Sequence, residues 1–273
     1  MKIALSQLDV VRGDPVHNLG SIQRSAKEAS GCGADLLCLP EMVTTGFDWK
    51  NTELLRQADQ HIAKISEIAT AHDLAICGSF LERTPAGKPA NTLMYFGSNG
   101  KLLAKYRKIH LFSVFREDKH VEPGVEVVVE DVGPCKAGFG ICYDLRFPEL
   151  FRANTERGAR IQILPAAFPH PRMEHWQTLI RARAIENQCF FIATNQVSVE
   201  AHGEEVGAAH YFGHSMVVDP WGEVLAEGGE LEEILTVQIN LELVAETRSK
   251  LPALRDRRPK LFVSPSTADA FRP

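Results

Sequence analysis

The sequence has no run of apolar residues long enough to cross a membrane, and it has no excess of positive charge. It contains 30 Lys and Arg residues against 35 Asp and Glu residues, for a formal net charge of -5. Such a balance provides no basic field for nucleic acid or for an anionic membrane surface. The first residues, MKIALSQLDVV, are too short and become polar too soon for a signal peptide. We therefore expect a cytoplasmic protein that binds neither nucleic acid nor a membrane.

Cysteines and metal-binding motifs are also scarce. The chain has 6 cysteines and no CxxC pair, so neither a disulfide framework nor a thiolate metal site is expected. Its 10 histidines form no HExxH pattern or other compact ligand spacing. We expect reduced thiols, no metal and no cofactor.

What the sequence does contain is an alternation of apolar, β-rich runs with amphipathic stretches. Strands are expected at 2–8, 35–40, 74–80, 91–97, 101–108, 126–132, 136–142, 160–165, 189–195, 214–220 and 234–240, and helices near 18–31, 54–72, 147–158 and 173–188. This order is typical of an α/β protein with sheets packed together and helices outside. Because no Ser/Gly-rich linker interrupts it, we expect a single domain.

Three of the expected strands end next to a reactive side chain. Glu41 ends DLLCLPE, Lys108 ends KLLAKYRK and Cys142 ends KAGFGIC. Ligands bind at strand ends in α/β folds, so a tertiary meeting of these three residues would form a site. Each residue also has a structural interpretation, with Cys142 as a packed core thiol and the other two as solvated strand ends. The isolated positions do not decide between the two interpretations.

The surroundings of Cys142 indicate a sharp elbow. In GFGICYDLRFPEL the strand is expected to run to Cys142 and a helix to start at Phe147. Helix amides that point toward the sulfur would favour a thiolate. Asp144 is expected to cap this helix, and Arg146 is expected to form a local ion pair with Glu149.

The segments LPEM, YRKIHLF and GICYDLRFPEL, in that order, resemble the three signature segments of the nitrilase or carbon-nitrogen hydrolase superfamily. The resemblance continues through HWQTLIRARAIENQ and GHSMVVDPWGEVLAEGG. It covers about residues 1–260 as one domain and leaves 261–273 as a C-terminal tail. It implies an α/β fold in the form of a four-layer α-β-β-α sandwich, and a homodimer or higher homo-oligomer.

The same resemblance implies catalytic roles. Cys142 is the nucleophile that forms a thioester with a small amide, and Glu41 is the base that takes the thiol proton. Lys108 and the backbone N–H of Tyr143 are the expected donors to the oxyanion. Ammonia leaves, and water then hydrolyses the thioester.

A second catalytic glutamate is expected in the segment FREDKHVEPG. The resemblance places it at Glu117, where it would orient Lys108 or the substrate. Asp118 and Glu122 are neighbouring acids in the same loop and leave this assignment open.

The segment FPHPRMEHW bears on the substrate, because it follows the expected strand 160–165. Its PRxxHW pattern is similar to the bacterial ω-amidase branch, whose substrates are monoamides of short α-keto dicarboxylic acids. Arg172 is the candidate that would bind the substrate carboxylate, with a surface arginine as the alternative. Aromatic residues are expected to line a small pocket there or, alternatively, to pack in the core: Phe47, Phe115, Tyr143, Phe168 and Trp176.

Other functions stay open at this point. Within the same superfamily, the alternatives are enzymes with a different substrate: an N-carbamoyl amino acid amidohydrolase, a deaminated glutathione amidase or an aliphatic nitrilase. A catalytically silent protein on the same fold would bind a small ligand or a partner. A conventional Cys-His hydrolase would instead need a histidine as the base.

Overall fold

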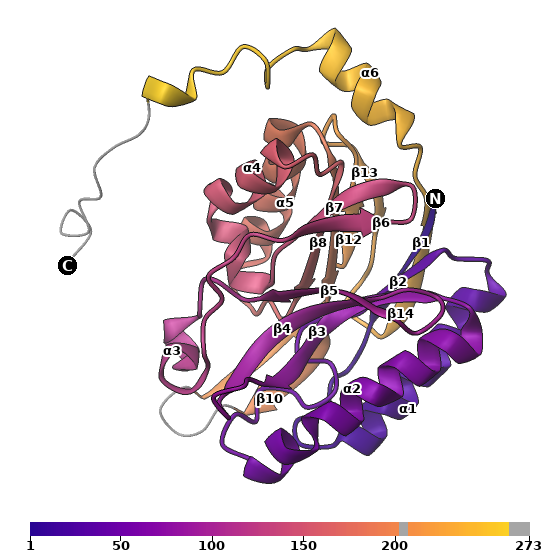
Figure 1. Ribbon diagram of the computed structural model, residues 1–273, viewed down its shortest axis with the longest axis vertical. Coiled ribbons are helices and arrows are strands. Elements are labelled where there is room, and N and C mark those ends of the chain that lie inside the picture. The colour runs from indigo at the N-terminus through magenta and orange to yellow at the C-terminus, as the bar shows by residue number, and fades with distance from the viewer. Residues whose placement is uncertain (202–206, 262–273) are drawn as a thin grey trace.

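A computed structural model describes residues 1–201 and 207–261 of the chain. Two six-stranded sheets form its centre, and helices cover the outer face of each sheet (Figure 1). The expected α-β-β-α sandwich is therefore confirmed. Within these residues, no helix is both long and apolar enough to span a membrane. The expected tail, 261–273, lies outside the described residues from 262 onward.

The first sheet contains the N-terminal strands. Its order is β14 (Glu233–Gln238), β1 (Lys2–Gln7), β2 (Leu36–Cys38), β3 (Ala75–Arg83), β4 (Pro89–Phe96) and β5 (Leu102–Arg107). The neighbours β1, β2 and β3 pair in parallel, whereas β4 and β5 return as an antiparallel hairpin. Helices α1 (Pro15–Gly31) and α2 (Thr52–His72) cover the outer face. Strands β2 and β5 consequently end at the same edge of the sheet.

The second sheet follows the same plan. Its order is β13 (Val224–Glu227), β12 (Met216–Val218), β9 (Phe190–Asn195), β8 (Ile161–Ala166), β7 (Cys135–Phe139) and β6 (Val129–Val132). Strands β7, β8 and β9 are parallel. Helices α4 (Pro148–Glu156) and α5 (Met173–Asn187) cover its outer face, and α6 (Glu242–Lys250) follows β14.

Side chains that alternate between the two faces of each strand pack into two different apolar clusters. In β1, Ile3 and Leu5 belong to the apolar cluster between the sheets, whereas Ala4 packs in the cluster under α1 and α2. A strand buried on both faces reads as a continuous apolar run, which is why KIALSQL and DLLCLP could be recognised. Trp176 of α5 is fully buried and joins the central cluster.

Shorter elements were harder to anticipate. A two-stranded ribbon of β10 (Val197–Ala201) and β11 (Ala208–Phe212) lies beside the main sheets, and α3 (Glu117–His120) is a single turn. The 3₁₀ turns of the described residues are η1 (Ser113–Phe115), η2 (Cys142–Arg146) and η3 (Pro259–Leu261). The expected strand 136–142 is too long, because β7 ends at Phe139 and η2 begins at Cys142.

Candidate active site

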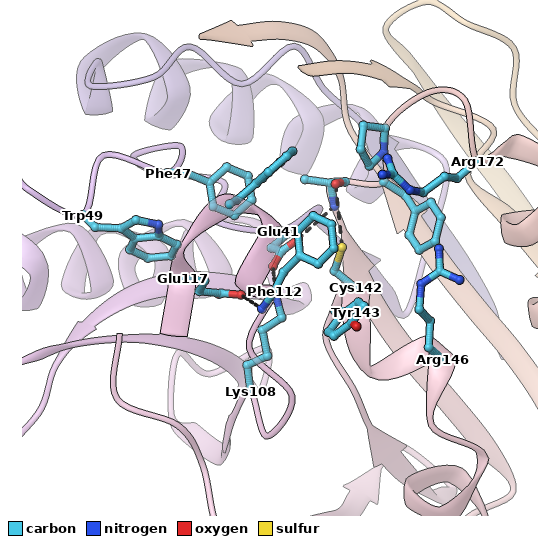
Figure 2. A pocket seen from close by; sticks show the side chains of 14 residues that line it. Glu41, Phe47, Trp49, Lys108, Phe112, Glu117, Cys142, Tyr143, Arg146 and Arg172 are labelled. Atoms are coloured by element: carbon cyan, nitrogen blue, oxygen red, sulfur yellow. Dashed lines mark hydrogen bonds and ion pairs between the residues drawn. The ribbon is translucent and has the colours of Figure 1, made fainter. Parts of the chain in front are cut away.

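The residues expected to be catalytic meet in one pocket where β2, β5 and β7 end. Glu41, Lys108, Glu117 and Cys142 are all buried and all line it (Figure 2). Glu41 follows β2, Lys108 follows β5, and Cys142 follows β7. These residues are far apart in the sequence, but the strands that they follow end on the same side of the two packed sheets, which brings the side chains together.

Lys108 occupies the centre of this cluster. Its Nζ donates to Glu41 Oε1 and to Glu117 Oε2, each at 2.8 Å. Ala104 and Tyr106 face the core between the sheets, and the same alternation turns Lys108 inward. Burial alone would lower the pKa of Lys108, but Glu117 and Glu41 raise it well above its usual value. The ammonium is therefore permanently charged at neutral pH.

Glu117 is the glutamate of its loop that reaches the cluster. It begins α3, and its Oε2 also accepts the backbone N–H of Phe112 at 2.8 Å. Glu122 instead accepts a hydrogen bond from Thr84, and Asp118 forms an ion pair with Lys119. The loop therefore delivers one carboxylate to the pocket from the three acids that the sequence offers.

Glu41 is held by neutral donors as well as by Lys108. Its Oε2 accepts the backbone N–H of Ala167 at 3.0 Å, and its Oε1 accepts Asn91 Nδ2 at 2.7 Å. Burial raises the pKa of Glu41, against the opposing effect of Lys108. A carboxylate with a raised pKa is a stronger base than an exposed one.

Cys142 has an unusual backbone and an unactivated thiol. Its φ is +44°, a left-handed conformation that a non-glycine residue adopts only under constraint. Burial raises its pKa well above the usual value and Glu41 adds to the effect, while Lys108 opposes it. The helix whose amides were expected to favour a thiolate, or an oxyanion beside it, begins six residues later, at Pro148. The raised pKa of Cys142 favours the protonated thiol in the resting site.

Asp144 does not cap the helix α4 as expected. Its carboxylate is fully buried and accepts hydrogen bonds from Tyr106 Oη at 2.7 Å and from Ile141 N at 2.9 Å. It also accepts the backbone N–H of His110 at 3.0 Å and lies 2.7 Å from His110 Nδ1. Because Ile141 precedes the nucleophile and His110 follows Lys108 by two residues, Asp144 ties the two strand ends together.

His110 bears on the Cys-His alternative. Its ring stacks on Phe147 with centroids 3.6 Å apart, and its Nδ1 is engaged by Asp144. The Cys142 sulfur instead lies 3.7 Å from Ala167 O, beside the Glu41 carboxylate. The group positioned to take the thiol proton is therefore a carboxylate.

Arg146 is another correction. Its expected partner Glu149 is in α4, whereas Arg146 ends η2, so the helical spacing behind that pairing does not exist. The guanidinium lies over the ring of Phe168, 5.4 Å from its centroid, and lines the pocket. Arg172 lines it too, as expected, so two arginines border the same cavity (Figure 2).

Aromatic side chains form most of the remaining wall. Phe47, Phe115, Tyr143 and Phe168 line the pocket as expected. Trp49 and Phe112 are two further members that the sequence did not single out. Trp176 packs in the core instead, and its Nε1 donates to His214 O at 2.8 Å.

Asn91 is the polar residue of the cluster that the sequence did not indicate. It is fully buried in β4, and its Nδ2 donates to both Glu41 Oε1 and Glu117 Oε1. The available signal was a polar residue at the start of the apolar run NTLMYF.

Across residues 1–201 and 207–261, no group of three or more His, Cys, Asp or Glu residues is arranged to hold a metal ion.

The sandwich and the Glu41, Lys108 and Cys142 cluster define a class of enzyme. The family model for carbon-nitrogen hydrolases matches residues 2–249, and the chain belongs to that family. It is a hydrolase of carbon-nitrogen bonds other than peptide bonds.

Individual relatives narrow the comparison. A 2-oxoglutaramate amidase of Bacillus subtilis is 35% identical over 262 residues, which cover 95% of this chain and 98% of the relative. An omega-amidase of Homo sapiens is 36% identical, with 96% of each chain covered.

Solved structures agree with the fold. A carbon-nitrogen hydrolase of Helicobacter pylori superposes with a TM-score of 0.90 at 27% identity, covering 96% of this chain and 97% of its own. An amidase of Nesterenkonia sp. AN1 gives 0.83 at 29% identity, covering 96% of this chain and 95% of its own; that variant carries the acetamide moiety of fluoroacetamide covalently on its active-site cysteine.

Proposed function

We propose that this chain is an ω-amidase, which hydrolyses the monoamide of a short α-keto dicarboxylic acid to the free acid and ammonia. One observation carries the proposal: the pocket that holds Cys142 beside Glu41 and Lys108 is also bordered by two arginines, Arg146 and Arg172. Within the described residues, no ion pair joins either guanidinium to a carboxylate. An anionic substrate would supply that carboxylate.

Acylation begins with the protonated thiol. As Cys142 Sγ attacks the amide carbon, Glu41 takes the thiol proton, and the carbonyl oxygen becomes negative. The Lys108 ammonium and the backbone N–H of Tyr143 donate to that oxygen. Tyr143 is the second residue of η2, so its N–H has no acceptor within the helix. One such donor contributes about 2.7–4 kcal/mol to lowering the barrier.

Collapse of the tetrahedral intermediate completes the first half of the reaction. The carbon-nitrogen bond breaks, Glu41 returns its proton to the nitrogen, and ammonia leaves a thioester on Cys142. Glu41 is again a carboxylate and takes a proton from water, whose oxygen attacks the thioester. The bond to sulfur breaks, the thiol regains its proton and the acid leaves. Glu117 holds Lys108 in place through both halves.

The shape and charge of the pocket support a slender acyl chain with an acidic end. Phe112 and Tyr143 lie with ring centroids 4.9 Å apart, and Phe168 borders the side where Arg146 lies. Figure 2 shows both arginines on one side of Cys142 and the Glu117 carboxylate on the other. The substrate amide would face Glu41 and Lys108, with Arg146, Arg172, Phe115, Phe168 and Tyr143 around the acyl chain.

The test is an ammonia-release screen with purified protein. It compares 2-oxoglutaramate and 2-oxosuccinamate with glutamine, N-carbamoyl amino acids, deaminated glutathione and simple nitriles. We expect the highest kcat/KM for an α-keto dicarboxylic monoamide. A clear preference for one of the other compounds would replace the assigned substrate, and equal rates would remove the assignment.

Two further parts of the proposal concern the protein in the cell. We expect a homodimer or higher homo-oligomer, which light scattering tests against the 30.3 kDa mass of one chain. We also expect a cytoplasmic location, which cell fractionation tests. A 30.3 kDa particle, or recovery outside the cytoplasmic fraction, would contradict the respective expectation.

A further inference from the structure

The two carboxylates of the pocket share a single cation. Glu41 and Glu117 both accept from Lys108 Nζ, and all three side chains are buried. Two ionised carboxylates and one ammonium leave a net negative charge in a space with little water. Like charges at short range favour protonation of one member, and Glu117 indeed acts to raise the pKa of Glu41. Glu41 therefore needs donors besides Lys108 if it is to stay a carboxylate.

Backbone amides supply one such donor to each acid, Ala167 N–H to Glu41 and Phe112 N–H to Glu117, and Asn91 supplies a side-chain donor that both acids share. Its Nδ2 lies 2.7 Å from Glu41 Oε1 and 3.0 Å from Glu117 Oε1. An amide nitrogen has two hydrogens, so one is available for each carboxylate. Asn91 pairs with Leu81 in the β3 and β4 ladder, and its backbone O accepts the N–H of Lys108 at 2.9 Å. The strand therefore fixes the amide between the two acids.

Ser79 determines which way the amide of Asn91 points. Its Oγ lies 2.5 Å from Asn91 Oδ1 and accepts the backbone N–H of Met42 at 3.2 Å. Since the Met42 amide uses the oxygen of Ser79 as an acceptor, the hydroxyl hydrogen is free to donate to Asn91 Oδ1. That donation holds the amide oxygen away from the carboxylates and turns both N–H bonds toward them.

The same serine also secures the backbone next to Glu41. Met42 follows Glu41 directly and has a φ of +48°, so this segment is held in a conformation that a non-glycine residue rarely adopts. Val43 N donates to Ser79 O at 3.0 Å, which adds a second bond to the same strand. Ser79 thus controls both the loop that carries Glu41 and the amide that faces it.

We propose that Asn91, oriented by Ser79, is a positioning residue that keeps Glu41 ionised and holds the Glu41 and Glu117 carboxylates against Lys108. The inference rests on the proposed role of Glu41 as the base for Cys142. Asn91 itself is not among the residues that line the pocket. Its effect is to keep a carboxylate, rather than a carboxylic acid, beside the nucleophile at neutral pH.

The test measures alkylation of the Cys142 thiol, a reaction that requires no hydrolysis of an amide. Iodoacetamide labelling of Cys142, followed by mass spectrometry, is measured against pH for the wild type and for S79A, N91L and N91D. Because the Cys142 thiol is protonated at rest, labelling near neutral pH depends on Glu41 as a carboxylate. Loss of a donated hydrogen bond raises the pKa of Glu41, so the acidic limb of the profile moves to higher pH.

The expected shifts are graded. N91L keeps the side-chain volume and removes both donors, so its labelling rate on the acidic limb falls about tenfold or more, equivalent to a limb displaced by about one pH unit. N91D adds a third carboxylate and shifts the limb further. S79A leaves the Asn91 amide free to rotate and gives the smallest shift in the same direction.

A matched control separates positioning from general destabilisation. Ser25 is a buried serine of α1 whose Oγ contacts Ser6 Oγ at 2.7 Å and donates to Ser21 O at 3.0 Å. S25A should lower the melting temperature about as much as S79A and leave the labelling profile unchanged. Folded S79A and N91L proteins with the wild-type profile would overturn the proposal. If the Asn91 variants do not fold, S79A decides alone.

The outcome also separates this inference from the proposed function. A shifted labelling profile together with no ammonia release from any amide would leave the positioning role intact and remove the substrate assignment. An E41Q protein that labels at Cys142 with the wild-type profile would remove the role of Glu41, and the positioning role with it.

Discussion

Strand β5 contributes to two clusters of cations and carboxylates, one on each of its faces. Lys105 and Arg107 point to one side and bind Glu82, at 3.0 Å and 2.9 Å. Lys108, just past the strand, turns to the other side and binds Glu41 and Glu117. Residue types and distances are nearly the same in both clusters. Only the second cluster adjoins a nucleophile.

The charge balance and burial explain why the two clusters differ. Burial alone would raise the pKa of Glu82, but hydrogen bonds from Arg107, Thr92 and Lys105 lower it to about 2. Glu82 therefore remains a carboxylate and is a very weak base. In the inner cluster two carboxylates share one buried lysine, and the pKa of Glu41 is raised. Burial away from water, together with an excess of carboxylate over cation, is what makes this glutamate basic.

The largest effect is expected from removing the base. E41Q keeps the shape of the side chain and should lower kcat/KM for the best amide by about 10²–10⁴-fold, the usual contribution of a general base. E82Q is the matched change in the outer cluster and should leave kcat/KM unchanged while lowering the melting temperature. Steady-state ammonia release measures both. Equal losses in the two variants would mean that the clusters do not differ in function.

Removing the lysine of each cluster should give the next largest effect. K108M removes an oxyanion donor and should lower kcat by about 10²–10³-fold. It also deprives Glu41 and Glu117 of their shared cation, so the pKa of Glu41 rises further. K105M, with its side chain 45% exposed, should retain the wild-type kcat. A K108M enzyme that is folded by its melting curve and fully active would exclude Lys108 from the mechanism.

The comparison also explains how much the sequence could predict. Glu41, Lys108 and Cys142 each follow an apolar strand, and both sheets expose their strand ends at one edge, so a continuous apolar run points directly to a site residue. Asn91 does not follow the end of an apolar run, so this pattern does not indicate it. It lies inside β4, and only the register with β3 places its amide between two acids.

Arg146 shows why local rules failed next to the nucleophile. Pairing it with Glu149 assumes one continuous helix, yet η2 and α4 are separate elements on either side of Phe147. The positive φ of Cys142 causes the chain to turn before a regular helix can start. Asp144 is satisfied by Tyr106 and His110 from another strand end, contacts with no sequence spacing to reveal them.

Arg146 and Arg172 differ from the cations of both clusters, because among the described residues neither forms an ion pair with a carboxylate. R146M and R172M should each raise KM for an α-keto dicarboxylic monoamide about ten- to a hundredfold, since a hydrogen bond to a charged group contributes about 1.5–3 kcal/mol. For a neutral aliphatic amide, KM should stay at the wild-type value. Parallel increases for both substrates would indicate a structural role for these arginines.

The smallest expected effect concerns stability against pH and applies to Glu82. Its pKa is lowered in the folded state from the usual 4.5 to about 2, so its stabilising contribution is complete above about 4.5 and disappears as the pH falls toward 2. Urea unfolding of the wild type and E82Q should therefore differ by about 1–3 kcal/mol at pH 7. The difference should shrink in acid. The pH dependence of the Glu41 contribution has the opposite sign. Its pKa is raised in the folded state, so its contribution to the free energy of unfolding falls as the pH increases and the group ionises. A wild-type to E82Q difference that persists unchanged at pH 2 would show that Glu82 stabilises the sheet by packing rather than by its charge.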